Sequence, residues 1–134
     1  MTTIGSCLCG DIQWQCDPDP ASDMHHCHCS ICRKTHGSQF VTFLWCNFRW
    51  LAGEEALVHY QATPDSIYER TFCPRCGSSG PIHAAGRMYM PAGSLDGDPA
   101  ARANRHIFTG PEHNPPWFSI TDGLEQAESF HTDS

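Results

Sequence analysis

The sequence predicts an all-β fold made of small antiparallel sheets in a single domain that covers residues 1–134. Three observations support this. The apolar segments are short, ten prolines and eleven glycines interrupt them over the whole length, and several segments alternate between apolar and polar residues. A chain of 134 residues is of single-domain size and can bury roughly 65 to 70 per cent of its unfolded surface. Long helices are therefore not expected.

Period-two alternation marks the predicted strands. They lie at residues 11–16, 39–45, 56–60 and 105–109. A further strand is expected at Tyr89, which Met88 and Met90 flank. One short helical turn is expected after Cys32, and no other helix is indicated.

Aromatic residues supply most of the predicted core, because large rings bury the most apolar surface. The core candidates are Phe40, Phe43, Trp45, Phe48 and Trp50. Near the carboxyl end, Trp117 and Phe118 follow two prolines and are expected to be a buried anchor for the last segment rather than a substrate lid.

Charge and hydropathy exclude several classes of protein. The net charge is −7, from eight basic and fifteen acidic residues, so a broad attraction to nucleic acid or to anionic lipid is not expected. A mean hydropathy of −0.41, without a long apolar run, excludes a membrane-spanning helix. The first residues lack the pattern of a secretory signal. The expected location is cytoplasmic, and no oligomeric state is indicated.

Nine cysteines are the strongest departure from average composition. An odd count without a secretory signal favours metal ligands over disulfides, as do the Cys-x-Cys and Cys-x-x-Cys spacings. Cys16 and Cys46 stand apart and are expected to be small buried hydrophobic residues. A thioredoxin-like redox pair would need a βαβ context, which the strand pattern does not provide. The other seven form three clusters: Cys7 and Cys9; Cys27, Cys29 and Cys32; Cys73 and Cys76.

Zinc is the metal that such clusters favour, and the clusters divide unequally between two sites. Cys73 and Cys76, followed by Gly77, form a zinc knuckle that needs two more ligands, from Cys7 and Cys9 or from part of the triplet. Joining the two pairs gives a closed, structural site of four thiolates. The triplet then keeps an open position, which is the pattern of a catalytic zinc.

Residues near the cysteine triplet could provide a further zinc ligand or a substrate contact. His36 follows Cys32 by four residues and could close the site as a fourth ligand. His28 is a poorer ligand candidate, since adjacent side chains of an extended segment face opposite ways. Most histidines are expected to be surface or hydrogen-bonding residues. Arg33 and Lys34 form a local basic patch that could attract a small anionic substrate, although such side chains are more often simply solvated.

The ordered motifs resemble the glutathione-dependent formaldehyde-activating enzyme family, which also includes centromere protein V. They lie at residues 5–10, 27–34 and 72–78, and the resemblance continues through residues 92–96, 106–108 and 117–118. Gly80 and Pro81 depart from the family's apolar pattern. The resemblance implies a β-tent fold with two zinc ions per chain. It places a structural zinc on Cys7, Cys9, Cys73 and Cys76 and a catalytic zinc on Cys27, Cys29 and Cys32.

The resemblance also implies a carbon-sulfur lyase activity similar to that of S-(hydroxymethyl)glutathione synthase. The thiol of glutathione would add to formaldehyde or to a related small aldehyde. A free thiol is mostly protonated at neutral pH, and coordination to zinc would supply the nucleophilic thiolate. Arg33 or Lys34 would meet a carboxylate of glutathione.

Two other functions stay open. The first is a non-catalytic zinc module that binds glutathione or a protein partner, and His36 as a zinc ligand would favour it. The second is a zinc hydrolase, which needs a general base beside bound water; Glu54, Glu55 and Glu69 qualify by residue type. The acidic balance argues against a chromosomal role.

Overall fold

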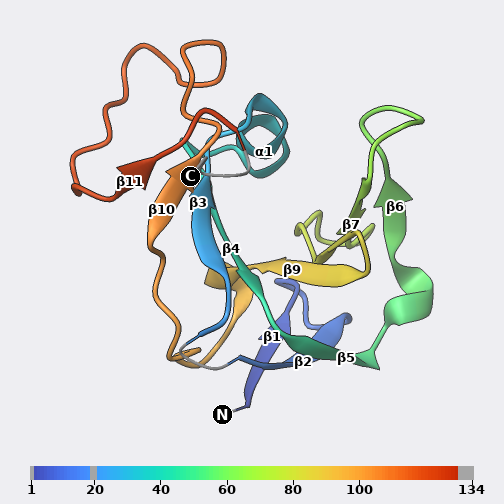
Figure 1. Ribbon diagram of the computed structural model, residues 1–134. Coiled ribbons are helices and arrows are strands. Elements are labelled where there is room, and N and C mark those ends of the chain that lie inside the picture. The colour runs from blue at the N-terminus through green and yellow to red at the C-terminus, as the bar shows by residue number, and fades with distance from the viewer. Residues whose placement is uncertain (1, 19–20, 130–134) are drawn as a thin grey trace. The chain divides into compact units, whose positions relative to one another are not determined.

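The computed structural model describes residues 2–18 and 21–129 and confirms the all-β prediction (Figure 1). The chain divides into two compact units. Unit 1 combines Met1–Asp23 with Leu44–Ala101, and unit 2 combines Met24–Phe43 with Arg102–Ser134. The division falls inside strand β4 (Val41–Trp45). No helix in the described part of the chain is long and apolar enough to cross a membrane.

Unit 1 contains a three-stranded antiparallel sheet in the order β1-β2-β5. Its strands are β1 (Thr3–Ser6), β2 (Gln13–Asp17) and β5 (Asn47–Ala52). Trp14 is fully buried in this sheet, opposite Gly5 on one side and Trp50 on the other. The two tryptophan rings meet edge to face, with centroids 6.1 Å apart, which is a favourable aromatic geometry.

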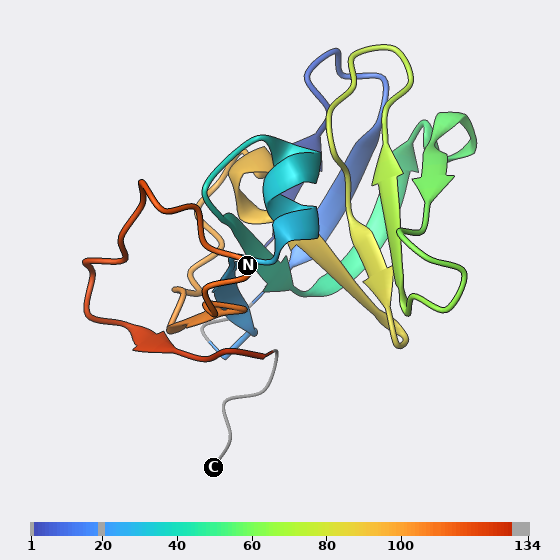
Figure 2. The ribbon, with the colours of Figure 1, turned by 90° about the horizontal axis from the view of Figure 1, so that it is seen from above.

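A second antiparallel ladder of unit 1 runs in the order β9-β8-β7-β6, the green to yellow part of the ribbon in Figure 2. It consists of β6 (Val58–Tyr60), β7 (Tyr68–Phe72), β8 (Ile82–Ala84) and β9 (Arg87–Pro91). Two 3-10 turns, η1 (Glu54–Ala56) and η2 (Ala92–Ser94), complete the unit. The loop between β7 and β8 carries Cys73 and Cys76.

Unit 2 is organised around β10 (Arg105–Ile107). Its other elements are β3 (Met24–Cys27), α1 (Ser30–His36), the first part of β4, and β11 (Glu125–Gln126). β10 lies between β3 and β11 and is parallel to both, with His106 opposite His26. This differs from the expected antiparallel pairing. Parallel neighbours need a long connection, and the chain between β3 and β10 supplies one.

The predicted strands are confirmed at β2, β4, β6, β9 and β10, each within two residues of the expected start. The helix starts earlier than expected, at Ser30, and contains Cys32 in its first turn. Among the core candidates Phe43 is fully buried, whereas the other four aromatic residues are half-buried. The prediction that Trp117 is a buried anchor is wrong, because 70% of its surface is exposed.

Cys16 and Cys46 form a disulfide, with Cα atoms 5.9 Å apart. Their predicted burial is confirmed, but the disulfide between them was not predicted, since the sequence favours metal ligands over disulfides. The strand register explains the pairing: Cys16 on β2 lies opposite Phe48 on β5, and Cys46 immediately precedes that strand. The seven remaining cysteines are free and are the seven candidate ligands.

Candidate metal centres

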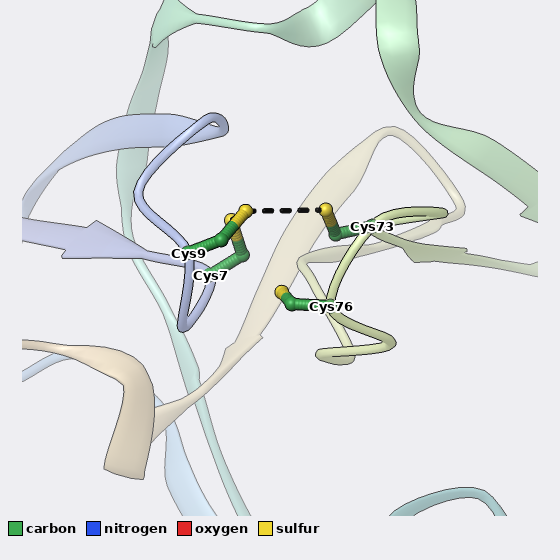
Figure 3. A group of neighbouring side chains, drawn as sticks. All are labelled: Cys7, Cys9, Cys73 and Cys76. Carbon is green, nitrogen blue, oxygen red and sulfur yellow. Dashed lines mark hydrogen bonds between the residues drawn. The ribbon is translucent and has the colours of Figure 1, made fainter.

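The two cysteine pairs of unit 1 lie on two loops that approach each other (Figure 3). The first loop follows β1 and closes with the Gly10 N–H donating to the Cys7 carbonyl. The second follows β7 and closes in the same way, from the Gly77 N–H to the Cys73 carbonyl. Both glycines have positive φ, 83° and 76°, a conformation that glycine adopts without strain. Each loop therefore aims two thiols at the other loop.

The four sulfurs of this cluster lie within 4.8 Å of one another. The separation is 3.5 Å between Cys7 and Cys9 and 3.8 Å between Cys9 and Cys73. Tetrahedral zinc, with bonds of about 2.3 Å to sulfur, requires sulfurs about 3.8 Å apart. The donor set and its spacing therefore fit zinc.

Protonation within the cluster is uneven. A hydrogen bond from the Asp11 N–H lowers the pKa of Cys9, but burial and the three neighbouring thiols outweigh it and raise that pKa to about 12. The Ser78 hydroxyl, helped by backbone N–H groups, lowers the pKa of Cys76 to about 5. Thiols and thiolates thus share protons in the cluster, and a bound divalent cation would displace those protons.

Two polar contacts join the loops outside the sulfurs. The Ser78 hydroxyl accepts a hydrogen bond from the Leu8 N–H at 2.9 Å and lies 3.2 Å from the Cys76 sulfur. The Arg75 guanidinium contacts both Asp11 carboxylate oxygens at 3.1 Å. This ion pair is exposed, so its contribution to stability is small. Ser78 is the more informative link, since it touches a candidate ligand.

The cysteine triplet belongs to unit 2, where β3 ends and α1 begins. Cys27 is the last residue of β3, Cys29 is the N-cap of α1, and Cys32 lies one turn further along. Cys27 and Cys32 are buried, with their sulfurs 3.4 Å apart, and Cys29 is half-buried. Chain geometry alone thus brings the three thiols together.

Within the triplet, the pKa values of Cys29 and Cys27 are shifted in opposite directions. Hydrogen bonds from the Cys27 and Cys32 thiols, supported by the backbone N–H groups of Cys32 and Ile31, lower the pKa of Cys29 to about 2. Hydrogen bonds to Cys29 and Cys32 and burial raise the pKa of Cys27. Soft sulfur donors of this kind suit zinc. The triplet is looser than the unit 1 cluster, because it is not among the described groups whose ligand atoms all lie within 4.8 Å.

His36 and the basic residues of α1 face different surroundings. The His36 ring packs edge to face on Phe43, at 5.8 Å between centroids, and His36 joins no compact ligand group among the described residues. Arg33 and Lys34 line a pocket of about 260 Å³ in unit 2. The other lining residues are Gly37, Ser38, Gln39 and Trp117. The predicted substrate contacts therefore share one pocket on the helix that carries Cys32.

The sequence did not indicate a histidine cluster in unit 2. His25, His28 and His106 are at most 2% exposed, and His28 and His106 are hydrogen-bonded to each other at 2.7 Å. Burial, followed by the nearby His106, lowers the pKa of His28 to about 4. The period-two position of His106 in the predicted strand was the only available signal, because 78 residues separate His28 from His106.

Comparisons with known proteins agree with this arrangement. A Halomonas elongata protein described as "Putative glutathione-dependent formaldehyde-activating enzyme" is 36% identical over 91 residues, which cover 59% of this chain and 54% of that protein. The chain thus spans about half the length of this curated relative. The crystal structure of a Rhodobacter sphaeroides protein superimposes with a TM-score of 0.57 at 23% identity, covering 71% of this chain and 89% of the other, and shows a shared fold.

The family described as "Glutathione-dependent formaldehyde-activating enzyme" matches residues 2–111. This range contains all seven free cysteines and the helix that carries Arg33 and Lys34. The chain belongs to the glutathione-dependent formaldehyde-activating enzyme family.

Proposed function

We propose that this protein is a zinc-dependent carbon-sulfur lyase that adds the thiol of glutathione to formaldehyde or to a related small aldehyde. The observation that carries the proposal is that α1 with its N-cap presents two of the three thiols of the triplet, Cys29 and Cys32, and lines a basic pocket. Membership of the glutathione-dependent formaldehyde-activating enzyme family supports glutathione and formaldehyde as the reactants. A cytoplasmic location, where glutathione is abundant, forms part of the proposal.

Two zinc ions would have different roles. Cys7, Cys9, Cys73 and Cys76 would hold one ion in a closed site and tie the two loops of unit 1 together. Cys27, Cys29 and Cys32 would hold the other and leave a position open. Zinc bound at the triplet would act as a Lewis acid that lowers the pKa of a thiol entering this position.

The pocket on α1 would position the tripeptide. Glutathione carries two carboxylates, so a protein of net charge −7 needs local cations to bind it. Arg33 offers a guanidinium whose buried Nε has no hydrogen-bond partner among the described residues, and Lys34 is exposed beside it. A guanidinium recognises a carboxylate through paired, charge-assisted hydrogen bonds. The exposed Trp117 ring forms an apolar wall of the same pocket.

The proposed reaction depends more on the orientation of the thiol and the aldehyde than on strong activation of either. A bond forms between the glutathione sulfur and the aldehyde carbon, and the thiol proton ends on the aldehyde oxygen. Holding the sulfur at the triplet and the carboxylates at Arg33 and Lys34 converts a bimolecular encounter into an oriented one. These residues therefore act mainly as positioning groups around the thiolate.

Exchange NMR tests the proposal directly. The interconversion of glutathione and formaldehyde with S-hydroxymethylglutathione is measured with zinc-loaded protein and with metal-free protein at equal total thiol. A zinc-dependent acceleration is the expected result. Without acceleration, and with two zinc ions shown to be bound, the lyase proposal fails. Glutathione binding would then identify a non-catalytic module.

Variants of the pocket refine the test. Arg33→Gln and Lys34→Gln are expected to raise the KM for glutathione about tenfold each, since each removes one charge-assisted contact. Arg49→Gln is the matched control: Arg49 is an exposed residue of β5 that bonds Gln15. An unchanged KM in both pocket variants would exclude this pocket as the glutathione site.

A further inference from the structure

Unit 2 contains a second group of potential metal ligands, which offers nitrogen and oxygen atoms rather than sulfur. His106 on β10 and His26 on β3 are direct partners in the parallel ladder. Asp122 lies in the loop that leads into β11, which pairs with the other side of β10. Three strands and one loop thus bring two imidazoles and a carboxylate together from three distant parts of the sequence.

The ligand atoms of these residues are close enough to share one ion. One atom from each of His26, His106 and Asp122 lies within 4.8 Å of the other two. The His106 Nε2 is 2.8 and 3.1 Å from the two Asp122 oxygens, and the two imidazole centroids are 4.7 Å apart. Tetrahedral zinc with bonds of about 2.0 Å to nitrogen and oxygen needs ligand atoms about 3.3 Å apart. Small side-chain movements would reach this spacing.

The opposite nitrogens of both rings already have partners. His26 Nδ1 lies 2.7 Å from the Thr42 hydroxyl, and His106 Nδ1 lies 2.7 Å from His28 Nε2. Metal-binding histidines almost always use the second ring nitrogen in this way, because the hydrogen bond fixes the tautomer and the ring orientation. The hydrogen bond at Nδ1 leaves Nε2 as the ligand nitrogen of each ring, and His106 Nε2 already lies against Asp122.

Proton positions are consistent with exchange for a cation. Without a metal, the His106 Nε2–H donates to Asp122, and His106 Nδ1 accepts from the His28 Nε2–H. A cation bound at His106 Nε2 takes the place of that proton, as metals do at histidine ligands. His106 would then donate from Nδ1 to His28, whose proton would move to its own Nδ1. That nitrogen is buried, as is the Asn114 Oδ1.

The group is buried on the side of its histidines and open to solvent on the side of Asp122. His106 is 1% exposed, His26 is half-buried, and the Asp122 side chain is 44% exposed. The rings of Phe40 pack on His26 and His106 at 4.7 and 5.6 Å and restrict their movement. The base of the group is thus rigid and dry, while the carboxylate edge meets solvent and provides an entry path.

A histidine-carboxylate pair elsewhere in the chain provides a comparison for the group of His26, His106 and Asp122. His59 and Glu69 in unit 1 are 2.9 Å apart, on neighbouring strands. Both are about half exposed, and they belong to no compact three-ligand group among the described residues. That pair is an ordinary surface contact. The unit 2 group differs by its third ligand, its buried imidazole and its oriented rings.

We propose that His26, His106 and Asp122 form a third metal site that binds a divalent transition-metal cation such as Zn²⁺ or Co²⁺ through two imidazoles and one carboxylate. Nitrogen and oxygen donors make it distinct from the thiolate sites in the metals it accepts, because thiolates prefer softer ions. Three protein ligands leave room for water or for an anionic ligand.

Cobalt titration tests the site in the full-length protein. The thiolate sites are first loaded with only two equivalents of Zn²⁺, which they bind and retain in preference to the nitrogen and oxygen site. Calorimetry and visible absorption then follow the addition of Co²⁺ alone. One further equivalent is expected, with d–d bands but without a sulfur-to-cobalt charge-transfer band. No further equivalent, or a sulfur charge-transfer band on the added cobalt, would overturn the proposal.

Variants assign the ligands. Asp122→Asn and His26→Gln are expected to weaken Co²⁺ binding by more than about 100-fold, and Thr42→Val by about tenfold to 100-fold through loss of ring orientation. Circular dichroism verifies that each variant is folded. Glu69→Gln is the matched control and should bind as the parent does. Unchanged affinity in Asp122→Asn and His26→Gln, or an equal loss in Glu69→Gln, would also reject the site.

Discussion

Ser78 shows how one hydroxyl serves two loops. It accepts the Leu8 N–H and contacts the Cys76 sulfur, where it is the main cause of the lowered pKa of Cys76. Removing it leaves the Leu8 N–H without this partner and raises the pKa of Cys76. The sequence could suggest the Cys76 contact, which spans two residues, but not the contact with Leu8, which spans 70.

Ser78→Ala is therefore expected to weaken zinc binding at the four-cysteine cluster about tenfold, as the loss of an outer hydrogen bond to a ligand does. Competition with a chromophoric chelator measures the affinity. Ser79→Ala is the control, because the neighbouring Ser79 forms a backbone bridge to Phe72 and its side chain makes no hydrogen bond within the described part of the chain. An equal change in both variants would contradict a specific role for the Ser78 hydroxyl.

The seven candidate zinc ligands could be found from the sequence, whereas the histidine group could not. Pairs of cysteine ligands can be recognised in a sequence because both often lie on one tight turn. Cys73 and Cys76, for example, are close both in sequence and in space. His26, His106 and Asp122 meet only through the parallel pairing of β3, β10 and β11. The sequence around a single histidine does not show which distant residues it will meet in the fold.

At the scale of the strand, hydropathy alternation is clearest where the buried residues are apolar. β2 is the clearest case, with Trp14 and Cys16 inside. β3 was missed because its buried positions are His25 and Cys27, and the polar histidine hides the alternation. β1 was missed because the small Gly5 faces Trp14 and gives no apolar signal. Tertiary contacts, rather than local preference, decide these strands.

Gly5 is the position at which the sheet of unit 1 is least tolerant. A Cβ added there would overlap the Trp14 indole, with Cε2 at 2.6 Å, and Trp14 is fully buried and cannot move away. Gly5→Ala is expected to lower the free energy of unfolding by about 1–3 kcal/mol, the usual cost of overpacking. Urea unfolding of the metal-loaded protein measures this. Gly93→Ala serves as control, since no atom lies within 4 Å of its added Cβ.

Both variants replace glycine by alanine outside the positive-φ region, so the comparison isolates steric overlap from backbone strain. An equal effect of the two substitutions would show that Gly5 is required for another reason than its contact with Trp14.

For the whole molecule, the cysteines divide into seven free thiols and one disulfide. Chelation of metal in denaturant, followed by reaction with a thiol reagent, is expected to detect seven thiols in the air-purified protein and nine after reduction. The bond closes a loop of about 30 residues, for which chain entropy predicts a stabilisation of about 3.6 kcal/mol. Nine thiols before reduction would contradict the disulfide.

The number of free thiols in the protein also depends on the compartment in which it is found. Disulfides are rare in the reducing cytoplasm, so a cytoplasmic protein would hold Cys16 and Cys46 as thiols more often than the purified protein does. Alkylation of thiols in intact cells before lysis, compared with alkylation after purification, separates the two conditions.

The two cysteine groups occupy different compact units, which predicts different consequences of losing each one. Cys76→Ser removes a thiolate from the cluster that joins two loops of unit 1. Structural zinc contributes on the order of 10 kcal/mol in small zinc domains, comparable to the whole stability of a domain, so this variant is expected to unfold. Cys29→Ser removes a half-buried sulfur at the start of α1 and is expected to abolish lyase activity while the fold persists.

Zinc stoichiometry, thermal unfolding and hydrogen exchange resolved by peptide distinguish these outcomes. Cys29→Ser should lose one zinc ion and exchange faster only around α1, whereas Cys76→Ser should lose protection across β1, β2 and β7. Equal unfolding of both variants would refute separate structural and catalytic roles. A folded Cys29→Ser protein that keeps its activity would instead remove the triplet from the reaction, leaving the pocket of Arg33 and Lys34 as a binding site without chemistry.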